Sequence, residues 1–150
     1  MNTPEDDIRY MDLALAEARK ALEIGEIPVG AVVVCNDRVV GRGHNMTQRL
    51  NDVTAHAEML AITAAAQTLG GKYLREATLY VTMEPCLMCA GAIAWSQVSR
   101  LVYAAPDPRR GYRSLTRPEA PVLHPSTQVV QGPLSDAALA LVRNFFANRR

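Results

Sequence analysis

Two cysteines separated by two residues place the strongest constraint on this fold. Cys86 and Cys89 follow Pro85, a residue favoured at the start of a helix because its missing N–H has no partner there. At positions i and i+3 of a helix both sulfurs lie on one face, and the positive helix end favours the metal-binding thiolate form. Cys35 makes the number of cysteines odd, which is a poor basis for a disulfide framework and favours metal or redox chemistry for the close pair.

A His-x-Glu sequence lies upstream of this pair, at another predicted helix start. His56, Cys86 and Cys89 provide three ligands of the types that zinc prefers, and three protein ligands leave the fourth position open for water. Glu58 is two residues from His56, so it can lie beside the metal without binding it and can transfer a proton. A redox dithiol is expected after the first strand of its domain, whereas this pair lies in mid-chain. The pattern therefore favours a catalytic zinc site.

Length and composition indicate one domain spanning residues 1–150. About half of the residues are hydrophobic, which is enough for a substantial core. No apolar run is long enough to span a bilayer, and residues 1–7 are polar and acidic, unlike a secretory signal. We therefore expect a soluble cytoplasmic protein that does not associate with membranes.

The charges are divided unevenly along the chain, although the net charge is only +1. Residues 1–99 carry 8 Lys+Arg and 12 Asp+Glu, whereas residues 100–150 carry 8 Arg and 3 acidic residues. Arginine binds phosphate well because its planar guanidinium donates two parallel hydrogen bonds. The C-terminal third is therefore either a phosphate-binding surface or an ordinary solvated one.

Helix and strand signals alternate along the sequence. The patterns predict a helix from Pro4, a hairpin at 29–40, a helix at 55–69 capped by Thr54, a strand at 79–81, a helix from Pro85 to about Ser96, strands at 101–103 and 127–130, and a last helix capped by Ser135 and ending at Arg150. Alternation of this kind predicts an α/β fold in which helices cover both faces of a partly parallel sheet.

Longer stretches around the motifs resemble a known family. These stretches are 28–32, 44–45, 54–58 and 79–92, with Phe145-Phe146 and the following arginines at the C-terminal end. His-x-Glu followed by Pro-Cys-x-x-Cys is the signature of zinc-dependent nucleobase deaminases. Nearly the whole chain is similar to bacterial tRNA-specific adenosine deaminases, which belong to the cytidine/deoxycytidylate deaminase superfamily.

The resemblance implies a cytidine-deaminase-like α/β/α sandwich with a mixed five-stranded sheet. It implies hydrolytic conversion of adenosine to inosine at the wobble position of a tRNA anticodon stem-loop, by a water that one zinc ion per subunit activates, with Glu58 as proton shuttle. It further implies that Asn45 hydrogen-bonds the base, that Val29 and the Ala57 backbone line the pocket, and that Asp107 lies near the target ribose. Homodimers are usual in this family.

Two other functions remain open at this point. The same site would serve a deaminase of a free nucleobase or nucleoside, such as guanine, cytosine or adenosine. A non-catalytic zinc-binding module would instead need a fourth protein ligand, for which Cys35, His44 and His124 are the candidates. Asn45 has a second interpretation as a turn residue. Residues 108–113, which are rich in arginine, depart from the small-residue loop of the family.

Overall fold

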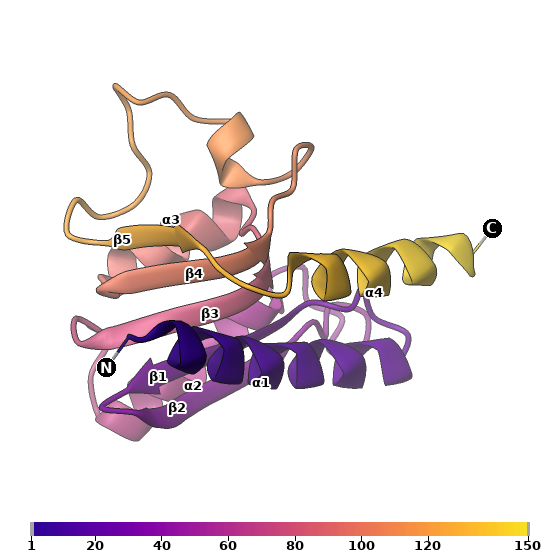
Figure 1. Cartoon of the computed structure of the whole chain (residues 1–150), viewed down its shortest axis with the longest axis horizontal. Coiled ribbons are helices and arrows are strands. Elements are labelled where there is room, and N and C mark those ends of the chain that lie inside the picture. Colours follow the sequence, from indigo (N-terminus) through magenta and orange to yellow (C-terminus); the bar gives the residue numbers. More distant parts are fainter. Residues whose placement is uncertain (1, 150) are drawn as a thin grey trace.

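The computed structural model describes residues 2–149 and consists of a five-stranded sheet between two layers of helices (Figure 1). The elements in chain order are α1 (Pro4–Glu23), β1 (Gly30–Cys35), β2 (Arg38–His44), α2 (Ala57–Leu69), β3 (Ala77–Met83), α3 (Leu87–Ser96), β4 (Arg100–Ala105), the 3-10 turn η1 (Tyr112–Ser114), β5 (Gln128–Gln131) and α4 (Ser135–Ala147). The predicted order of helices and strands is confirmed.

The sheet is mixed, as the resemblance implied. Its strand order is β2-β1-β3-β4-β5. Strand β1 pairs antiparallel with both β2 and β3, whereas β3, β4 and β5 are parallel to one another. The hairpin turn falls at Asn36 and Asp37, which both have positive φ angles, as a tight two-residue turn between twisted strands requires.

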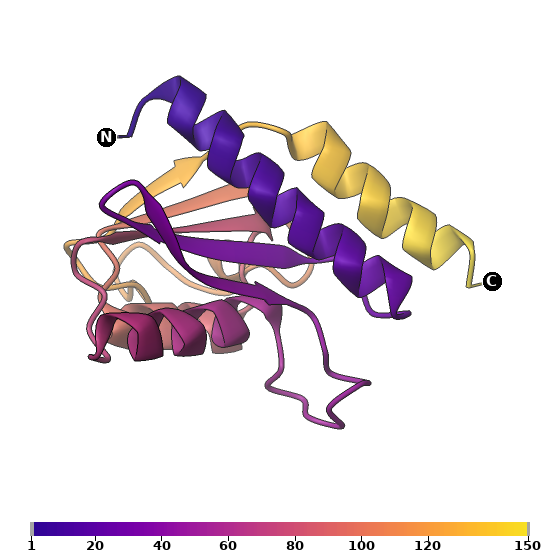
Figure 2. The same cartoon turned by 90° about the horizontal axis from the view of Figure 1, so that it is seen from below.

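Helices cover both faces of the sheet, so the three-layer α/β/α prediction is confirmed. Helices α1 and α4 lie side by side on one face, and α2 and α3 lie on the other (Figure 2). Strand residues alternate between the two layers: Val33 and Leu79 pack toward α2 and α3, whereas Val32 and Tyr80 pack toward α1 and α4. Because both layers bury strand side chains, the central strands consist almost entirely of buried residues.

Two predicted helix starts were wrong by two residues. Thr54 does not cap α2, since its hydroxyl and N–H both bind the carboxylate of Asp52. Helix α3 begins at Leu87, two residues after Pro85. In both places the residue directly before the helix is a predicted metal ligand. Ser135 was predicted to cap the last helix, but Leu134 lies at the cap and Ser135 is the first helical residue. This helix ends at Ala147, and the predicted end at Arg150 lies outside the described residues.

A buried ion pair ties the first helix to the sheet. The guanidinium of Arg100 donates two hydrogen bonds, each of 2.8 Å, to the two carboxylate oxygens of Asp7, and the Tyr80 hydroxyl donates a third of 2.7 Å. The hydrogen bonds from Arg100 lower the pKa of Asp7, although burial opposes them. The pair joins residue 7 to residue 100, and thus α1 to the start of β4.

No helix among residues 2–149 combines the length and apolarity that crossing a bilayer requires.

We predict that Asp7→Asn destabilises the protein by about 3–5 kcal/mol at neutral pH, because it leaves the buried Arg100 guanidinium without a counter-charge. Urea unfolding measures this loss. Because folding lowers the pKa of Asp7, its contribution is present above the ordinary value of 3.8 and is lost as the pH falls through the lowered pKa. The difference between the wild type and the variant should therefore shrink in acid.

Asp12→Asn is the matched control, since Asp12 lies on the same helix with an exposed side chain. Its effect on the free energy of unfolding should stay within about 0.5 kcal/mol. Equal stabilities of the two variants would contradict a stabilising role for the ion pair.

Candidate metal centre and active site

Two helices of the same layer begin at residues whose side chains do not cap them. His56 precedes α2 and Cys86 precedes α3; both have extended backbone, and neither side chain makes a capping hydrogen bond. N-cap positions usually carry Ser, Thr, Asp or Asn, whose oxygens bind the free N–H groups of the first turn. The imidazole and the thiol are instead free to bind a different partner.

The three predicted ligands come together. The Nδ1 atom of His56 lies 3.6 Å from the Sγ atom of Cys86 and 3.4 Å from the Sγ atom of Cys89, and the three ligand atoms all lie within 4.8 Å of one another. A tetrahedral zinc ion with Zn–S of about 2.3 Å and Zn–N of about 2.0–2.1 Å would separate N and S by about 3.6 Å. The spacing of the donors therefore fits zinc.

The candidates for a fourth protein ligand lie elsewhere. Cys35 packs in the hydrophobic core, the His44 ring contacts the carboxylate of Glu17, and the His124 ring contacts the hydroxyl of Ser126. Within residues 2–149, no fourth His, Cys, Asp or Glu joins the cluster. The protein thus offers three ligands, as in catalytic zinc sites, rather than the four of a structural site.

The ionisable groups of the cluster depend on one another. A hydrogen bond from Cys89 lowers the pKa of Cys86 to about 4, and the same bond together with burial raises the pKa of Cys89. Hydrogen bonding to Cys86 also raises the pKa of His56. Two thiolates this close repel each other, so the protein alone favours one thiolate and one thiol. A bound cation would allow the second thiol to ionise.

Glu58 lies beside this cluster with little access to water. Its residue is 4% exposed, and its carboxyl group interacts with the Cys89 thiol. Burial raises the pKa of Glu58 to about 7, which is close to the value at which one group can both accept and donate a proton at neutral pH. The structure therefore places a buried carboxyl group with a raised pKa beside the three predicted ligands.

Asn45 fixes the first turn of α2. Its side-chain oxygen accepts a hydrogen bond of 3.2 Å from the N–H of Ala57, and its own N–H donates to the carbonyl of Val29. Strand β2 also packs directly against this turn, because a Cβ atom at Gly43 would lie only 2.3 Å from the Ala57 carbonyl oxygen. Asn45 is therefore more than a turn residue, since it joins β1, β2 and α2 beside the metal ligands.

A buried carboxylate that sequence reasoning missed holds the loop before His56. Glu26 accepts hydrogen bonds from the Thr47 hydroxyl and from the N–H groups of Gln48 and Arg49. Burial alone would raise the pKa of Glu26, but these bonds outweigh it and lower the pKa. The sequence feature that could have revealed this role of Glu26 is its position as the lone acidic residue of the apolar stretch 24–29.

The loop and His56 enclose a hollow of about 390 Å³, lined only by residues of 47–56.

A second buried carboxylate holds the loop on the other side of the cluster. The two oxygens of Glu84 accept hydrogen bonds from the N–H groups of Asp107 and Arg113. The Asp107 carboxylate is engaged locally, since one of its oxygens accepts from the N–H groups of Arg109 and Arg110. Asp107 thus shapes its own loop.

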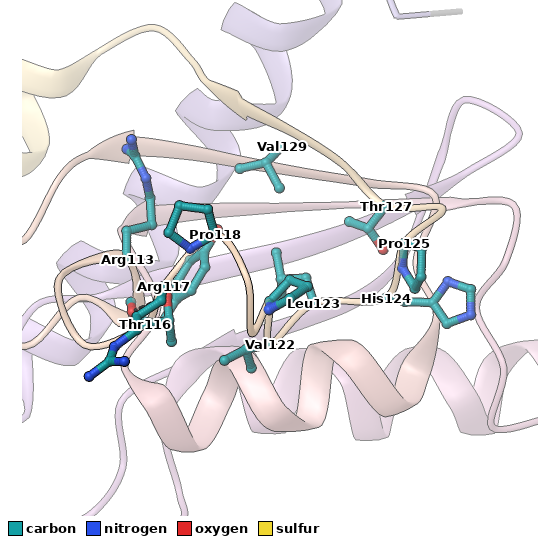
Figure 3. A pocket seen from close by; sticks show the side chains of 12 residues that line it. Arg113, Thr116, Arg117, Pro118, Val122, Leu123, His124, Pro125, Thr127 and Val129 are labelled. Carbon is teal, nitrogen blue, oxygen red and sulfur yellow. Dashed lines mark hydrogen bonds between the residues drawn. The ribbon is translucent and has the colours of Figure 1, made fainter.

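Another hollow, of about 440 Å³, lies at the β5 edge of the sheet (Figure 3). Its lining includes apolar side chains such as Val122 and Leu123, and none of the metal-site residues. The side chains of Arg113, Arg117 and His124 point in different directions around it (Figure 3). Because ligand sites place a few polar groups so that they converge, this hollow is a poor candidate for an active site.

Comparisons with known proteins agree with this geometry. The model of the cytidine and deoxycytidylate deaminase zinc-binding region matches residues 4–105. A tRNA-specific adenosine deaminase of Agrobacterium fabrum is 43% identical over 146 residues, which are 94% of each chain.

Two solved structures are also similar. One comes from a study of A-to-I editing by tRNA:A34 deaminases at the wobble position of transfer RNA. It has a TM-score of 0.81 and 42% identity, and the match covers 89% of this chain and 99% of that one. The other is a guanine deaminase from Nitrosomonas europaea, with a TM-score of 0.76 and 28% identity over 92% of this chain and 83% of that one.

We predict that Asn45→Ala lowers the free energy of unfolding by about 1 kcal/mol, because the buried N–H of Ala57 loses its acceptor. Asn45→Asp keeps an acceptor and places a negative charge at a helix N-terminus, so it should recover most of the loss. Urea unfolding of both variants measures this. The exposed Asn144 of α4 supplies the control Asn144→Ala. An Asn45→Ala protein as stable as that control would contradict the assigned role.

Proposed function

The chain belongs to the cytidine and deoxycytidylate deaminase family, and we propose that it hydrolytically deaminates adenosine to inosine at the wobble position of a tRNA anticodon. The chemistry rests on one observation, which is the convergence of His56, Cys86 and Cys89 beside the buried carboxyl group of Glu58. The choice of substrate is supported by the 43% identity to a tRNA-specific adenosine deaminase over nearly the whole chain.

We propose that His56, Cys86 and Cys89 hold one zinc ion per subunit. Their donor atoms are those that zinc prefers, and the distances of 3.4 and 3.6 Å from the imidazole nitrogen to the two sulfurs suit a tetrahedral ion. Zinc held by three protein ligands supplies Lewis acidity and lowers the pKa of a bound water.

Glu58 is the proposed proton shuttle. Its pKa of about 7 suits it to take a proton from the attacking water and to give it to a ring nitrogen of the base. Its contact with the Cys89 thiol keeps the carboxyl group beside the metal ligands. Burial excludes competing bulk water from this transfer.

Three further residues are proposed to contact the substrate. The Asn45 side chain uses its oxygen to bind Ala57, which leaves its NH₂ group as the donor for the base. Val29 is partly buried and packs against the core cluster that contains Ala57, so it is placed to form an apolar wall. Asp107 begins the loop held by Glu84, which reaches Cys86 through Gly111, and we propose that Asp107 lies near the target ribose.

The alternative substrate is a free nucleobase, and the similarity to a guanine deaminase supports it. That similarity is lower, at 28% against 42% identity for the tRNA deaminase structure. The hollow beside His56 is lined by loop residues between 47 and 56, and no described residue of α4 contributes to it. The C-terminal helix therefore does not close this hollow, which is compatible with a substrate larger than a free base.

We propose that residues 1–150 act as one deaminase domain. The segment after the matched region supplies β5, which pairs with β4, and α4, which packs on α1 and β4. We also propose that the protein acts in the cytoplasm, since its tRNA substrate and a reducing environment for the cysteines are both found there.

We propose further that the protein is a homodimer that uses the outer face of α3. Three large apolar side chains of this helix are exposed, namely Leu87, Met88 and Trp95, and Trp95 is 80% exposed. Gly91 lies between them, with open space around its Cα. Concentrated apolar exposure is typical of protein interfaces.

We predict that purified protein forms inosine in an anticodon stem-loop RNA with adenosine at the wobble position, and that Glu58→Gln lowers kcat by about 10²–10⁴-fold because the proton shuttle is lost. Nucleoside analysis of the digested RNA measures inosine. Free guanine, cytosine and adenosine are incubated in parallel, and released ammonia is measured.

Metal analysis is the control for this experiment. Wild type and Glu58→Gln should each contain one zinc per chain, whereas Cys86→Ser should lose zinc and Cys35→Ser should keep it. Ammonia from a free base with unchanged RNA would assign the protein to the small-molecule deaminases. Activity retained by Glu58→Gln would overturn the assignment of the shuttle.

We predict that light scattering after gel filtration gives twice the 16.4 kDa mass of one chain, and that Trp95→Glu lowers it to that of a monomer by placing a charge in an apolar interface. Ile8→Glu is the matched control, because Ile8 is a half-exposed apolar residue on the opposite helical layer. A Trp95→Glu protein that remains dimeric would place the interface elsewhere.

A further inference from the structure

We propose that Arg109 and Arg110 form a phosphate clamp that holds the RNA backbone beside the metal centre. This inference rests on the proposed function, since it assigns a contact with the polyanionic substrate of the same site. It concerns the arginine-rich segment 108–113, to which the proposed chemistry assigns no role.

The arginine loop lies directly against a metal-site residue. Gly111 forms an antiparallel bridge with Cys86, and the N–H of Tyr112 donates a 2.9 Å hydrogen bond to the carbonyl of Pro85. Arg110 therefore directly precedes Gly111, the residue that pairs with Cys86. The loop also follows the carboxyl end of β4, which is where the binding sites of α/β sheets are found.

The loop is held in place from both ends. Glu84 binds the N–H groups of Asp107 and Arg113, at 3.1 and 3.0 Å. Within this span, one carboxylate oxygen of Asp107 accepts hydrogen bonds of 3.0 Å from the N–H groups of both Arg109 and Arg110. A backbone that is already ordered loses less conformational entropy when a ligand binds.

Glycine at position 111 permits this close approach. A Cβ atom there would lie 2.2 Å from the Oε2 atom of Glu84 and 2.5 Å from the carbonyl oxygen of Asp107. Glu84, Asp107 and Gly111 therefore determine where the two arginine side chains leave the loop.

The two guanidinium groups are free to bind a ligand. Arg109 and Arg110 are exposed, and neither side chain makes a hydrogen bond or an ion pair with another residue of the described range 2–149. Arg113 differs, since its guanidinium hydrogen-bonds the Tyr103 hydroxyl. Three arginines and one aspartate in residues 107–113 give the loop a net positive charge.

A single-stranded stretch of RNA is the ligand that fits. A nucleotide whose base enters the site carries phosphates on both sides, close to the mouth of the site, and arginine binds phosphate through two parallel hydrogen bonds. A free nucleobase has no group for these side chains. The clamp would therefore strengthen the binding of a polynucleotide and leave the chemistry at the metal unchanged.

The test compares two double variants that each remove two positive charges. Arg109→Ala/Arg110→Ala removes the clamp, and Arg19→Ala/Arg38→Ala removes exposed arginines from α1 and β2. The Kd for the anticodon stem-loop RNA is measured with each pair in the Glu58→Gln background, from about 50 to 200 mM KCl. Each lost phosphate contact should reduce the slope of log K against log salt by about 0.7.

We expect the clamp variant to bind the RNA at least tenfold more weakly at low salt and to lose about 1.4 from that slope. The Arg19/Arg38 variant should match its parent. In the active protein the clamp variant should raise KM for RNA and change kcat by less than twofold, and Arg109→Lys/Arg110→Lys should restore part of the binding.

Two failures are distinguishable. If the wild type deaminates the RNA but the clamp variant keeps the slope and Kd of the control, the clamp is overturned and the proposed function stands. If the wild type neither binds nor deaminates the RNA, the proposed function fails and the clamp fails with it.

Discussion

His56 directly precedes α2 and Cys86 directly precedes α3. The rest of the site depends on the close approach of the N-terminal ends of these two helices. Helix α2 packs on β1 and β2, and α3 connects the parallel strands β3 and β4. The two helices share one layer, so their N-termini can lie next to each other on the same side of the sheet. Because neither first residue caps its helix, an imidazole and a thiol are left to face each other across 3.6 Å.

Two buried carboxylates hold the two loops beside the site in the same way, by accepting hydrogen bonds from backbone N–H groups. Glu26 binds backbone N–H groups of the loop before His56, and Glu84 binds those of the loop after β4. A buried carboxylate is costly unless its oxygens are hydrogen-bonded; here backbone dipoles supply the bonds, so neither acid needs a cation. The side chains of Arg109 and Arg110 therefore remain available to a ligand.

The chemical residues could be predicted from the sequence because their spacing is dictated by local helix geometry. The two cysteines, the histidine and Glu58 lie in short motifs, and the alternation of elements fixed the three-layer fold. The contacts that hold α1 and the loop before His56 could not be predicted, because they join residues distant in the chain, such as Asp7 with Arg100 and Glu26 with Arg49. The start of α2 was predicted too early because Thr54 has the right chemistry for a cap but binds Asp52 instead.

The proposed chemistry and the proposed RNA contact use different kinds of segment, although the two segments are neighbours. Glu58 and Cys89 are buried and His56 and Cys86 are partly buried, all four in or next to the first turn of a helix, where a substitution would disturb packing as well as the proposed catalysis. Residues 108–110 lie on an exposed loop, whose backbone is held by Glu84 and Asp107. Side chains can change there without moving a ligand atom of the metal centre. A change of side chain in this loop would therefore bear on which substrate is held, whereas the proposed deamination chemistry depends on the His-x-Glu and Pro-Cys-x-x-Cys motifs.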